Sequence, residues 1–154
     1  MTQKEKNLQS KFRIENIRQI ECFFALNPEF KPEKDKKYQI GLSLNISFQK
    51  KGKKVRVILK FSSEEKEQPF VFRVIFEGIF VFDKMPEKEE LERIVHINCA
   101  SIIFPFIRES VADLTRRSGL TPLILDPVNF VALYESSKEK EKKLEKKPKS
   151  NLGG

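Results

Sequence analysis

The chain has 154 residues, of which 39% are apolar, and these values favour one soluble globular domain that buries about two thirds of its unfolded surface. No apolar run approaches the roughly 20 residues of a membrane span, and the polar start lacks the apolar region of a secretory signal, so we expect a cytoplasmic protein without membrane insertion. The net charge of +8 lies mostly in residues 1–11 and 136–154, which is more typical of solvated ends than of a nucleic-acid-binding surface.

Four segments in the first half are predicted to be β-strands. Residues 12–26 alternate imperfectly between apolar and polar, and a slip near Ile17 indicates a bulge or bend. The Pro-rich stretch 27–37 is typical of a loop, so the first strand need not pair with the second. Residues 38–49 and 54–62 alternate on either side of a Lys-rich turn, and this pattern predicts a hairpin.

The fourth predicted strand, residues 69–82, is rich in aromatic side chains on one side. All its phenylalanines fall on even positions and so on a single face: Phe70, Phe72, Phe76, Phe80 and Phe82. The opposite face still shows apolar residues such as Val71, Ile75 and Ile79. Because one helix layer covers only one face of a sheet, the remaining apolar area favours contact with another chain, and we expect a homo-oligomer built by stacking sheets or by pairing helices.

From residue 86 onward the pattern becomes helical. Pro86 and the acids after it suit the first turn of a helix. A longer helical segment, residues 101–119, ends with basic residues and with Gly119 as the stop signal. Pro105 must lie near the start of this segment or kink it.

After an apolar loop comes a final helix, with Asp126 or Asn129 as its N-cap, which runs into the charged tail. Strands followed by helices predict an α+β fold: a four-stranded antiparallel sheet with a long helix packed on it and a C-terminal helix. We expect one domain over residues 1–135. Residues 136–154 form a Lys/Glu-rich tail that is expected to extend the helix and then become disordered.

Residues that could carry chemistry are scarce. Cys22 and Cys99 lie far apart, His96 is the single histidine, and no cluster has metal-ligand spacing. Cys99 and His96 are three residues apart, but an ordinary buried thiol beside a satisfied imidazole is the simpler interpretation. The sequence also lacks phosphate-binding, dinucleotide-binding and nucleophile-elbow motifs. We therefore expect no enzyme activity, no cofactor and no metal.

The second half carries the most specific pattern. Residues 99–110 read C-x-x-I-I-F-P-F-I-R-E-S, residues 113–134 read DLTRRSGLTPLILDPVNFVALY, and both follow the GIF of residues 78–80. Together these stretches resemble the SecB family of export chaperones almost without interruption. The first half is similar in its strand pattern alone.

The resemblance implies dimers that join sheet edges and a homotetramer, a dimer of dimers, formed mainly through long helices. It also implies an ATP-independent holdase that binds unfolded polypeptides, secretory preproteins in particular, in apolar grooves and keeps them translocation-competent. Such binding needs no catalytic residue, because a groove lined by Phe, Ile and Leu accepts many extended sequences.

By this resemblance, seven apolar residues are candidates for the lining of the client-binding groove: Phe76, Phe80, Phe104, Phe106, Leu120, Leu123 and Leu125. Core packing is the alternative for each ring taken singly, so the prediction rests on the set as a whole. Arg108 and Glu109 are expected either to orient a subunit contact or to form a routine exposed pair.

In the SecB family, acidic side chains on the outer faces of the first and fourth strands contact the translocase motor SecA. The corresponding positions here, Ile20, Phe24 and Arg73, have lost or reversed that charge. The resemblance implies SecA as a partner, whereas these positions speak against docking in the standard manner. A chaperone dedicated to the antitoxin of a toxin-antitoxin-chaperone system is therefore the second hypothesis. A basic nucleic-acid-binding protein is the alternative of another class.

Overall fold

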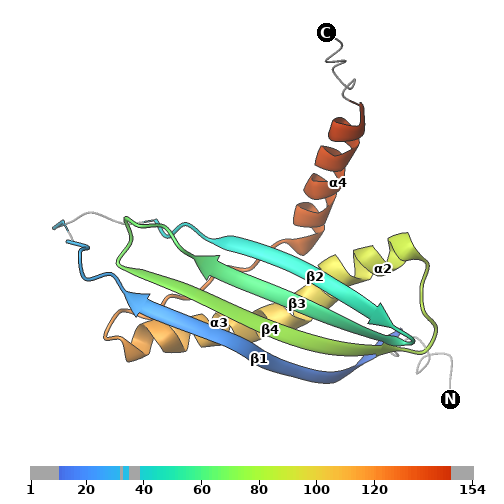
Figure 1. Cartoon of the computed structure of the whole chain (residues 1–154), viewed down its shortest axis with the longest axis horizontal. Coiled ribbons are helices and arrows are strands. Elements are labelled where there is room, and N and C mark those ends of the chain that lie inside the picture. Colours follow the sequence, from blue (N-terminus) through green and yellow to red (C-terminus); the bar gives the residue numbers. More distant parts are fainter. Residues whose placement is uncertain (1–10, 32, 35–38, 147–154) are drawn as a thin grey trace, which may run out of the picture.

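The computed structural model describes residues 11–31, 33–34 and 39–146, and it shows one sheet with helices on one side (Figure 1). The elements are β1 (Phe12–Leu26), β2 (Ser43–Lys51), β3 (Lys54–Ser63), β4 (Phe70–Phe82), α2 (Lys88–Ile94), the π-helical turn η1 (Val95–Cys99), α3 (Ala100–Arg117) and α4 (Phe130–Lys146). The predicted fold class is confirmed: an antiparallel four-stranded sheet, a long helix on it and a C-terminal helix. The start of the predicted second strand, residue 38, lies outside the described residues.

The strands lie in the order β1-β4-β3-β2, so β1 pairs with β4 and not with its neighbour in sequence. β2 and β3 form the predicted hairpin, in which Lys51 lies opposite Lys54. Gly52 in the turn has a φ of 60°, a left-handed conformation that a tight hairpin favours and that glycine adopts without steric cost. The Pro-rich loop after β1 therefore carries the chain from one edge of the sheet to the other.

β1 has two irregularities in its register with β4, at Glu15 and at Ile20. The sequence predicted one slip near Ile17, and the structure places one on each side of that residue. Each extra residue reverses the alternation of side chains, so two of them restore it. As a result, Phe24 lies opposite Phe72 on the side of the sheet that faces the helices.

The even-numbered phenylalanines of β4 face the helices, as predicted, and all of them are buried. β3 adds alternate residues to the same layer: Val55, Val57, Leu59 and Phe61. α3 packs on this layer with buried residues that recur along one side of the helix: Ile103, Phe104, Ile107, Val111 and Thr115. A single helix is therefore sufficient to seal the centre of the aromatic face.

The two helical segments predicted after residue 86 form one continuous run, Lys88–Arg117, which η1 interrupts only by its wider turn. The run begins two residues after Pro86, and Pro105 lies inside α3. By length and composition alone this run meets the criterion for a membrane span, a criterion that the core helix of a globular protein also meets. α3 occupies such a core position on the sheet.

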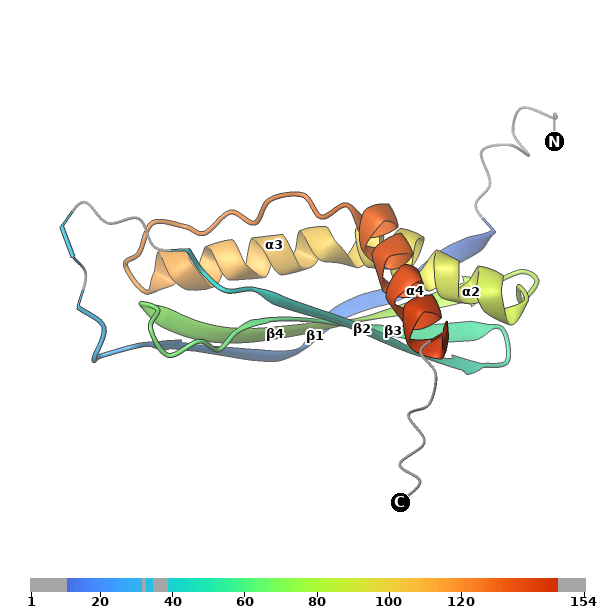
Figure 2. The same ribbon diagram turned by 90° about the horizontal axis from the view of Figure 1, so that it is seen from above.

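α3 ends in a Schellman motif. Gly119 has a φ of 82° and donates its N–H to the carbonyl of Arg116, and Leu120 donates to the carbonyl of Thr115. The glycine stop predicted from the sequence is confirmed. The helix-connecting loop, residues 118–129, then returns along the outer side of α3 (Figure 2).

α4 begins at the residue after Asn129, whose Oδ1 accepts a hydrogen bond from the N–H of Ala132 at 3.0 Å. Of the two N-caps that the sequence offered, the structure therefore selects Asn129 rather than Asp126. Phe130 is buried and packs edge-to-face on Phe104. Beyond its first turns, α4 stands away from the sheet (Figure 1).

Candidate functional site

The helix-connecting loop presents apolar side chains along α3. Ile124 is 64% exposed, Leu120 and Leu123 are half-buried, and Leu125 points into the core. Outward and inward side chains alternate because the loop is extended here. The loop therefore forms an apolar strip that the rest of the described chain covers only in part.

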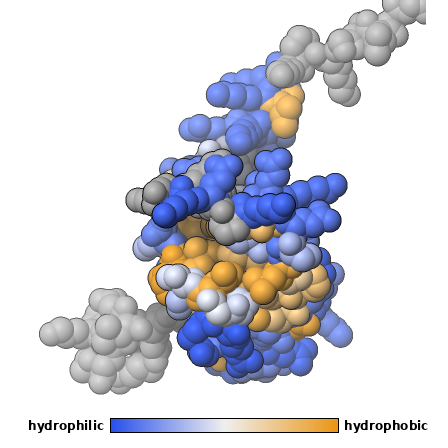
Figure 3. All heavy atoms as spheres, turned by 90° about the vertical axis from the view of Figure 1, so that its left-hand side faces the viewer, coloured by the Kyte–Doolittle hydropathy of each residue, from blue (hydrophilic) through white to orange (hydrophobic). Residues whose placement is uncertain are grey.

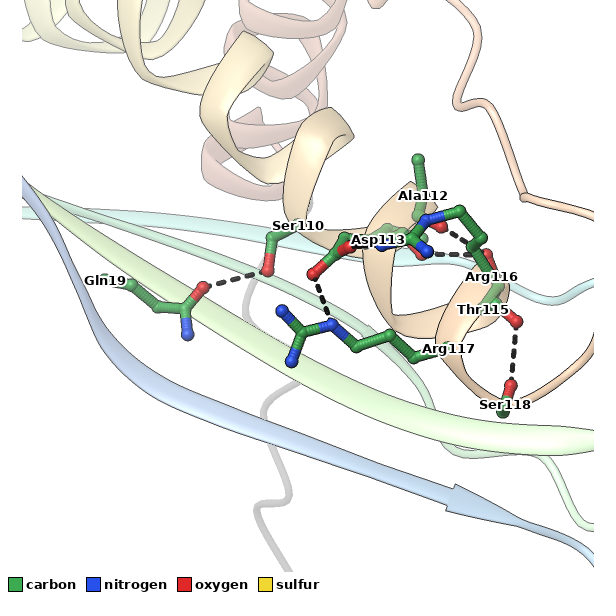
Figure 4. A network of polar contacts seen from close by, with 9 residues as sticks. Gln19, Ser110, Ala112, Asp113, Thr115, Arg116, Arg117 and Ser118 are labelled. Atoms are coloured by element: carbon green, nitrogen blue, oxygen red, sulfur yellow. Dashed lines mark hydrogen bonds and ion pairs between the residues drawn. The ribbon is translucent and has the colours of Figure 1, made fainter.

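A pocket of about 560 Å³ opens between α3 and β1. The rings of Phe76 and Phe106 lie in its wall with their centroids 6.1 Å apart, and Phe106 is 41% exposed. Ser110 Oγ donates a hydrogen bond to Gln19 Oε1 at 2.8 Å and so ties the helix to the edge strand (Figure 4). The remaining lining residues are Glu109, Ala112, Asp113, Arg116 and Pro122. Aromatic rings inside a polar rim suit an apolar side chain of an extended peptide.

A further apolar patch lies at the end of the molecule where β1 and α3 end and where β2 and β4 begin. Figure 3 shows this patch as a continuous apolar area bordered by hydrophilic side chains. Leu26 at the end of β1 is 51% exposed, and Leu42 just before β2 is 45% exposed. An apolar area that the described residues leave exposed in this way is typical of a surface that binds another polypeptide.

The polar side chains of Gln68 and Asn27 fix the backbone around this patch. Gln68 is 2% exposed; its Nε2 donates to Ser63 Oγ at 2.6 Å and its Oε1 accepts from the N–H of Gly41 at 2.5 Å. Asn27 donates to two backbone carbonyls of the β3–β4 connection. The segments that carry the exposed leucines are thus held to the same turn.

The structure divides the seven predicted groove residues into two groups. Phe80, Phe104 and Leu125 are at most 4% exposed and belong to the core, so in this conformation they support the surface from below. The residues that reach the pocket or the loop surface are Phe76, Phe106, Leu120 and Leu123.

Three exposed apolar residues on the helix side were not identified from the sequence. They are Ile124 in the loop strip and Leu26 and Leu42 in the end patch. For Ile124 a signal existed, because it has the opposite parity to its neighbours Leu123 and Leu125 within an extended loop. The two leucines gave no such signal, since their exposure depends on where the strands stop.

Arg108 contacts the helix-connecting loop and Phe104 within the chain rather than forming an exposed pair with Glu109, and its alternative role in a subunit contact stays a prediction. Its Nε donates to the carbonyl of Leu125 at 2.8 Å, and its guanidinium lies over the ring of Phe104 at 5.0 Å. Both contacts are within the chain, and the first of them reaches the loop.

The residues predicted at partner-docking positions do not share one surface. Arg73 lies on the face of the sheet away from the helices, where it binds Glu21 at 2.9 Å and Glu64 at 3.0 Å. Hydrogen bonds to these carboxylates raise the pKa of Arg73. Phe24 faces the helix side and stacks on a phenylalanine of β4. Ile20 is an exposed residue at the second register irregularity of the edge strand.

Glu77 lies on the same face of the sheet, which none of the described helices covers and which we call the open face. Its side chain is nevertheless buried by its neighbours and is 4% exposed. Its Oε2 accepts hydrogen bonds from Arg56 at 3.2 Å and from Arg18 at 3.5 Å. Burial by itself raises the pKa of Glu77, but the two arginines outweigh it and leave the pKa below its ordinary value. Half-buried Ile75 lies opposite Lys60. The open face therefore combines charged side chains with apolar ones, among them Phe23, which is 45% exposed beside Arg73.

Cys99 and His96 both lie in η1. Cys99 is fully buried, and burial raises the pKa of its thiol to about 12, which keeps it protonated at neutral pH. Nδ1 of His96 lies 2.8 Å from the carbonyl oxygen of Glu92. Within the part of the chain that the structure describes, no three His, Cys, Asp or Glu side chains gather as a metal site would require.

The sequence that forms this fold matches a known protein family. The model of the family described as preprotein translocase subunit SecB matches residues 21–141. The chain belongs to the SecB family. The match reaches from the second half of β1 into α4, so it includes the sheet as well as the segments that carried the resemblance in the sequence.

Curated SecB relatives are moderately similar. The protein-export protein SecB of Ruegeria pomeroyi is 36% identical over 102 residues, which are 66% of this chain and 54% of that protein. The protein of the same name from Rhodopseudomonas palustris is 42% identical over 72 residues, 47% of this chain and 43% of that one. The chain thus spans about half the length of the curated relatives that it matches.

Two solved structures share the fold. One is the SecB-like chaperone of Mycobacterium tuberculosis in complex with a ChAD peptide from the HigA1 antitoxin. Its TM-score is 0.66 at 21% identity, over 77% of this chain and 91% of that one. The other, a protein of unknown function from Streptococcus agalactiae, has a TM-score of 0.53 at 10% identity, over 75% of this chain and 97% of that one.

Proposed function

We propose that this SecB-family protein is an ATP-independent holdase that binds unfolded polypeptides, secretory preproteins in particular, and keeps them translocation-competent. The observation that carries the proposal is the open apolar surface on the helix side, made of the loop strip, the pocket beside Phe106 and the end patch. Curated relatives named protein-export protein support the export context.

The composition of this surface suits an extended guest. A polypeptide in extended conformation sends alternate side chains to one side, and each apolar one that is buried contributes about 1–2 kcal/mol where the site is partly covered already. Several such contacts in series hold a client without selecting one sequence. The charged rim of the pocket, with Glu109, Asp113 and Arg116, keeps the edges of the surface in water.

We further propose that the chain assembles into a homotetramer, a dimer of dimers. β1 is a long edge strand of 15 residues that pairs on one side only within the described chain. A pocket of about 590 Å³ beside Phe12 is lined by half-buried Ile94, Ile97 and Ile102 of the helical layer. A second copy seated on this side would bury apolar area that one chain leaves open.

The test measures aggregation of a reduced, unfolded client protein without nucleotide, together with the molar mass by light scattering. The expected outcome is suppression of aggregation that added ATP does not change, by a particle of four chains. A monomer that leaves aggregation unaltered would contradict the holdase and the assembly at once. A monomer that suppresses aggregation would contradict the assembly alone.

A chaperone dedicated to one antitoxin is the second candidate function. Arg73 is bound to Glu21 and Glu64, and by the resemblance to the SecB family its position is one at which docking of SecA calls for an acidic side chain. A protein of the same fold has been solved with an antitoxin peptide. Competition between an antitoxin peptide and an unfolded preprotein for the same chaperone distinguishes the two functions, because a dedicated chaperone prefers the antitoxin strongly and a general one does not.

The remaining features of the proposal follow from the holdase function. We propose a cytoplasmic location and no catalytic activity. If the protein acts in protein export, we propose SecA as the recipient of its clients. We also propose one domain over residues 1–135 with a tail over residues 136–154, of which α4 forms the first part as far as Lys146.

A further inference from the structure

The helix-connecting loop is tied by its backbone to two side chains of α3. Thr115 Oγ1 accepts a hydrogen bond from the N–H of Leu123 at 2.9 Å. Arg108 Nε donates to the carbonyl oxygen of Leu125 at 2.8 Å. The two ties lie on either side of Ile124, the most exposed apolar side chain of the loop. Side chains of the helix thus hold the backbone and leave the outward loop side chain free.

Both anchors are themselves fixed in place. Thr115 is fully buried, and its hydroxyl donates to the carbonyl of Val111 at 2.9 Å, which directs its lone pairs away from the helix axis and toward the loop. The guanidinium of Arg108 lies 5.0 Å over the buried ring of Phe104. Without such anchors, a segment that lacks regular secondary structure would bond to water and sample many conformations.

We propose that Thr115 and Arg108 are positioning residues for client binding. They hold residues 123–125 in one extended conformation, so that the loop meets a guest as a preformed wall. A wall that is already ordered loses less conformational entropy when a client binds, and the affinity rises accordingly. This inference rests on the proposed holdase function and adds to it the residues that prepare the surface without contact to the client.

The test uses the full chain and two substitutions at one position. Thr115→Val removes the hydroxyl and keeps the shape of the side chain, whereas Thr115→Ser keeps the hydroxyl. In Thr115→Val we expect faster hydrogen exchange at the amide of Leu123 and about a tenfold weaker affinity for a fluorescent unfolded client. Thr115→Ser is expected to restore both values. Arg108→Lys, which keeps the charge but loses the planar N–H donor, is expected to weaken client binding in the same way.

Three results would overturn the proposal. One is an unchanged affinity of Thr115→Val although the Leu123 amide exchanges faster, and another is a loss of affinity that Thr115→Ser does not restore. If Thr115→Val fails to fold, an Arg108→Lys chain that melts like the wild type and binds clients equally well overturns it. If the wild-type protein binds no client, the proposed holdase function is contradicted as well. If the wild type binds clients and Thr115→Val binds them with the same affinity, this proposal alone is contradicted.

Discussion

Ile124 and Leu144 form a matched pair that tests where clients bind. Both are aliphatic side chains of the same size, and they are 64% and 68% exposed. Ile124 lies on the helix-connecting loop, whereas Leu144 lies near the end of α4, away from the sheet (Figure 1). Because neither side chain belongs to the core, replacement by Asn is expected to change the free energy of unfolding by less than about 0.5 kcal/mol.

The effect on client binding follows from the area that a guest can still cover. Complete burial of such a side chain contributes about 1.5–3 kcal/mol, and roughly two thirds of Ile124 remain available, so Ile124→Asn should cost about 1–2 kcal/mol of binding free energy. This corresponds to a Kd raised about 5- to 30-fold. Fluorescence anisotropy of a labelled, reduced client without ATP measures it, with Leu144→Asn as the control, whose Kd should stay unchanged. Equal effects of the two substitutions would refute the placement of the client on the loop.

Three further predictions concern the scaffold. The pKa of Glu77 in the folded state lies below its ordinary value of 4.5. The stabilisation that ionised Glu77 adds to the free energy of unfolding is therefore complete above pH 4.5 and is lost as the pH falls through the folded-state pKa. In urea titrations, Glu77→Gln should therefore be about 1–2 kcal/mol less stable than the wild type at neutral pH and approach it in acid; a gap independent of pH would contradict this. Phe80→Ala should cost about 3–5 kcal/mol of unfolding free energy, because the ring is fully buried, and a melting temperature equal to the wild type would place Phe80 outside the core. Asn129→Ala should destabilise the first turn of α4 by about 1 kcal/mol, because the side-chain cap is lost. Hydrogen exchange at the Ala132 amide should become faster, and an unchanged exchange rate would show that Asn129 does not stabilise this turn.

The strands and the helix ends were predictable because short-range rules determine them. The period-two alternation gave the aromatic face of β4, and Gly119 marked the end of α3 through a backbone conformation that few other residues adopt. The choice between Asp126 and Asn129 as N-cap could not be made in advance, because either side chain can cap and only the observed start of the helix decides.

The open face of the sheet shows where alternation alone was insufficient. The pattern identified Ile75 and Ile79 on that face but gave no information about their cross-strand neighbours. In the structure Ile75 lies opposite Lys60 and Ile79 opposite Arg56, since β3 and not β1 alone borders β4. The strand order places these charged side chains there, and strand order is a long-range property that no local pattern encodes.

The candidate surface was predictable as a set rather than residue by residue. Phe76 and Phe106 reach the pocket, whereas Phe80 and Phe104 have the same chemistry and lie in the core. Phe104 and Phe106 are two residues apart on α3 and so lie on different sides of the helix, and Phe76 is the β4 ring beside Phe106. The positioning contact of Thr115 with the loop had no sequence signal, because the two partners meet only after the chain reverses at Gly119.

Clients are proposed to bind on the helix side of the sheet and not on its open face. Isoleucine methyl resonances distinguish the faces, since Ile124 lies on the loop of the helix side and Ile75 and Ile79 lie on the open face. On addition of a reduced, unfolded client, we expect the resonance of Ile124 to shift or broaden while those of Ile75 and Ile79 stay in place. A shift of the open-face resonances with Ile124 unchanged would show that clients bind the open face, and it would contradict the account.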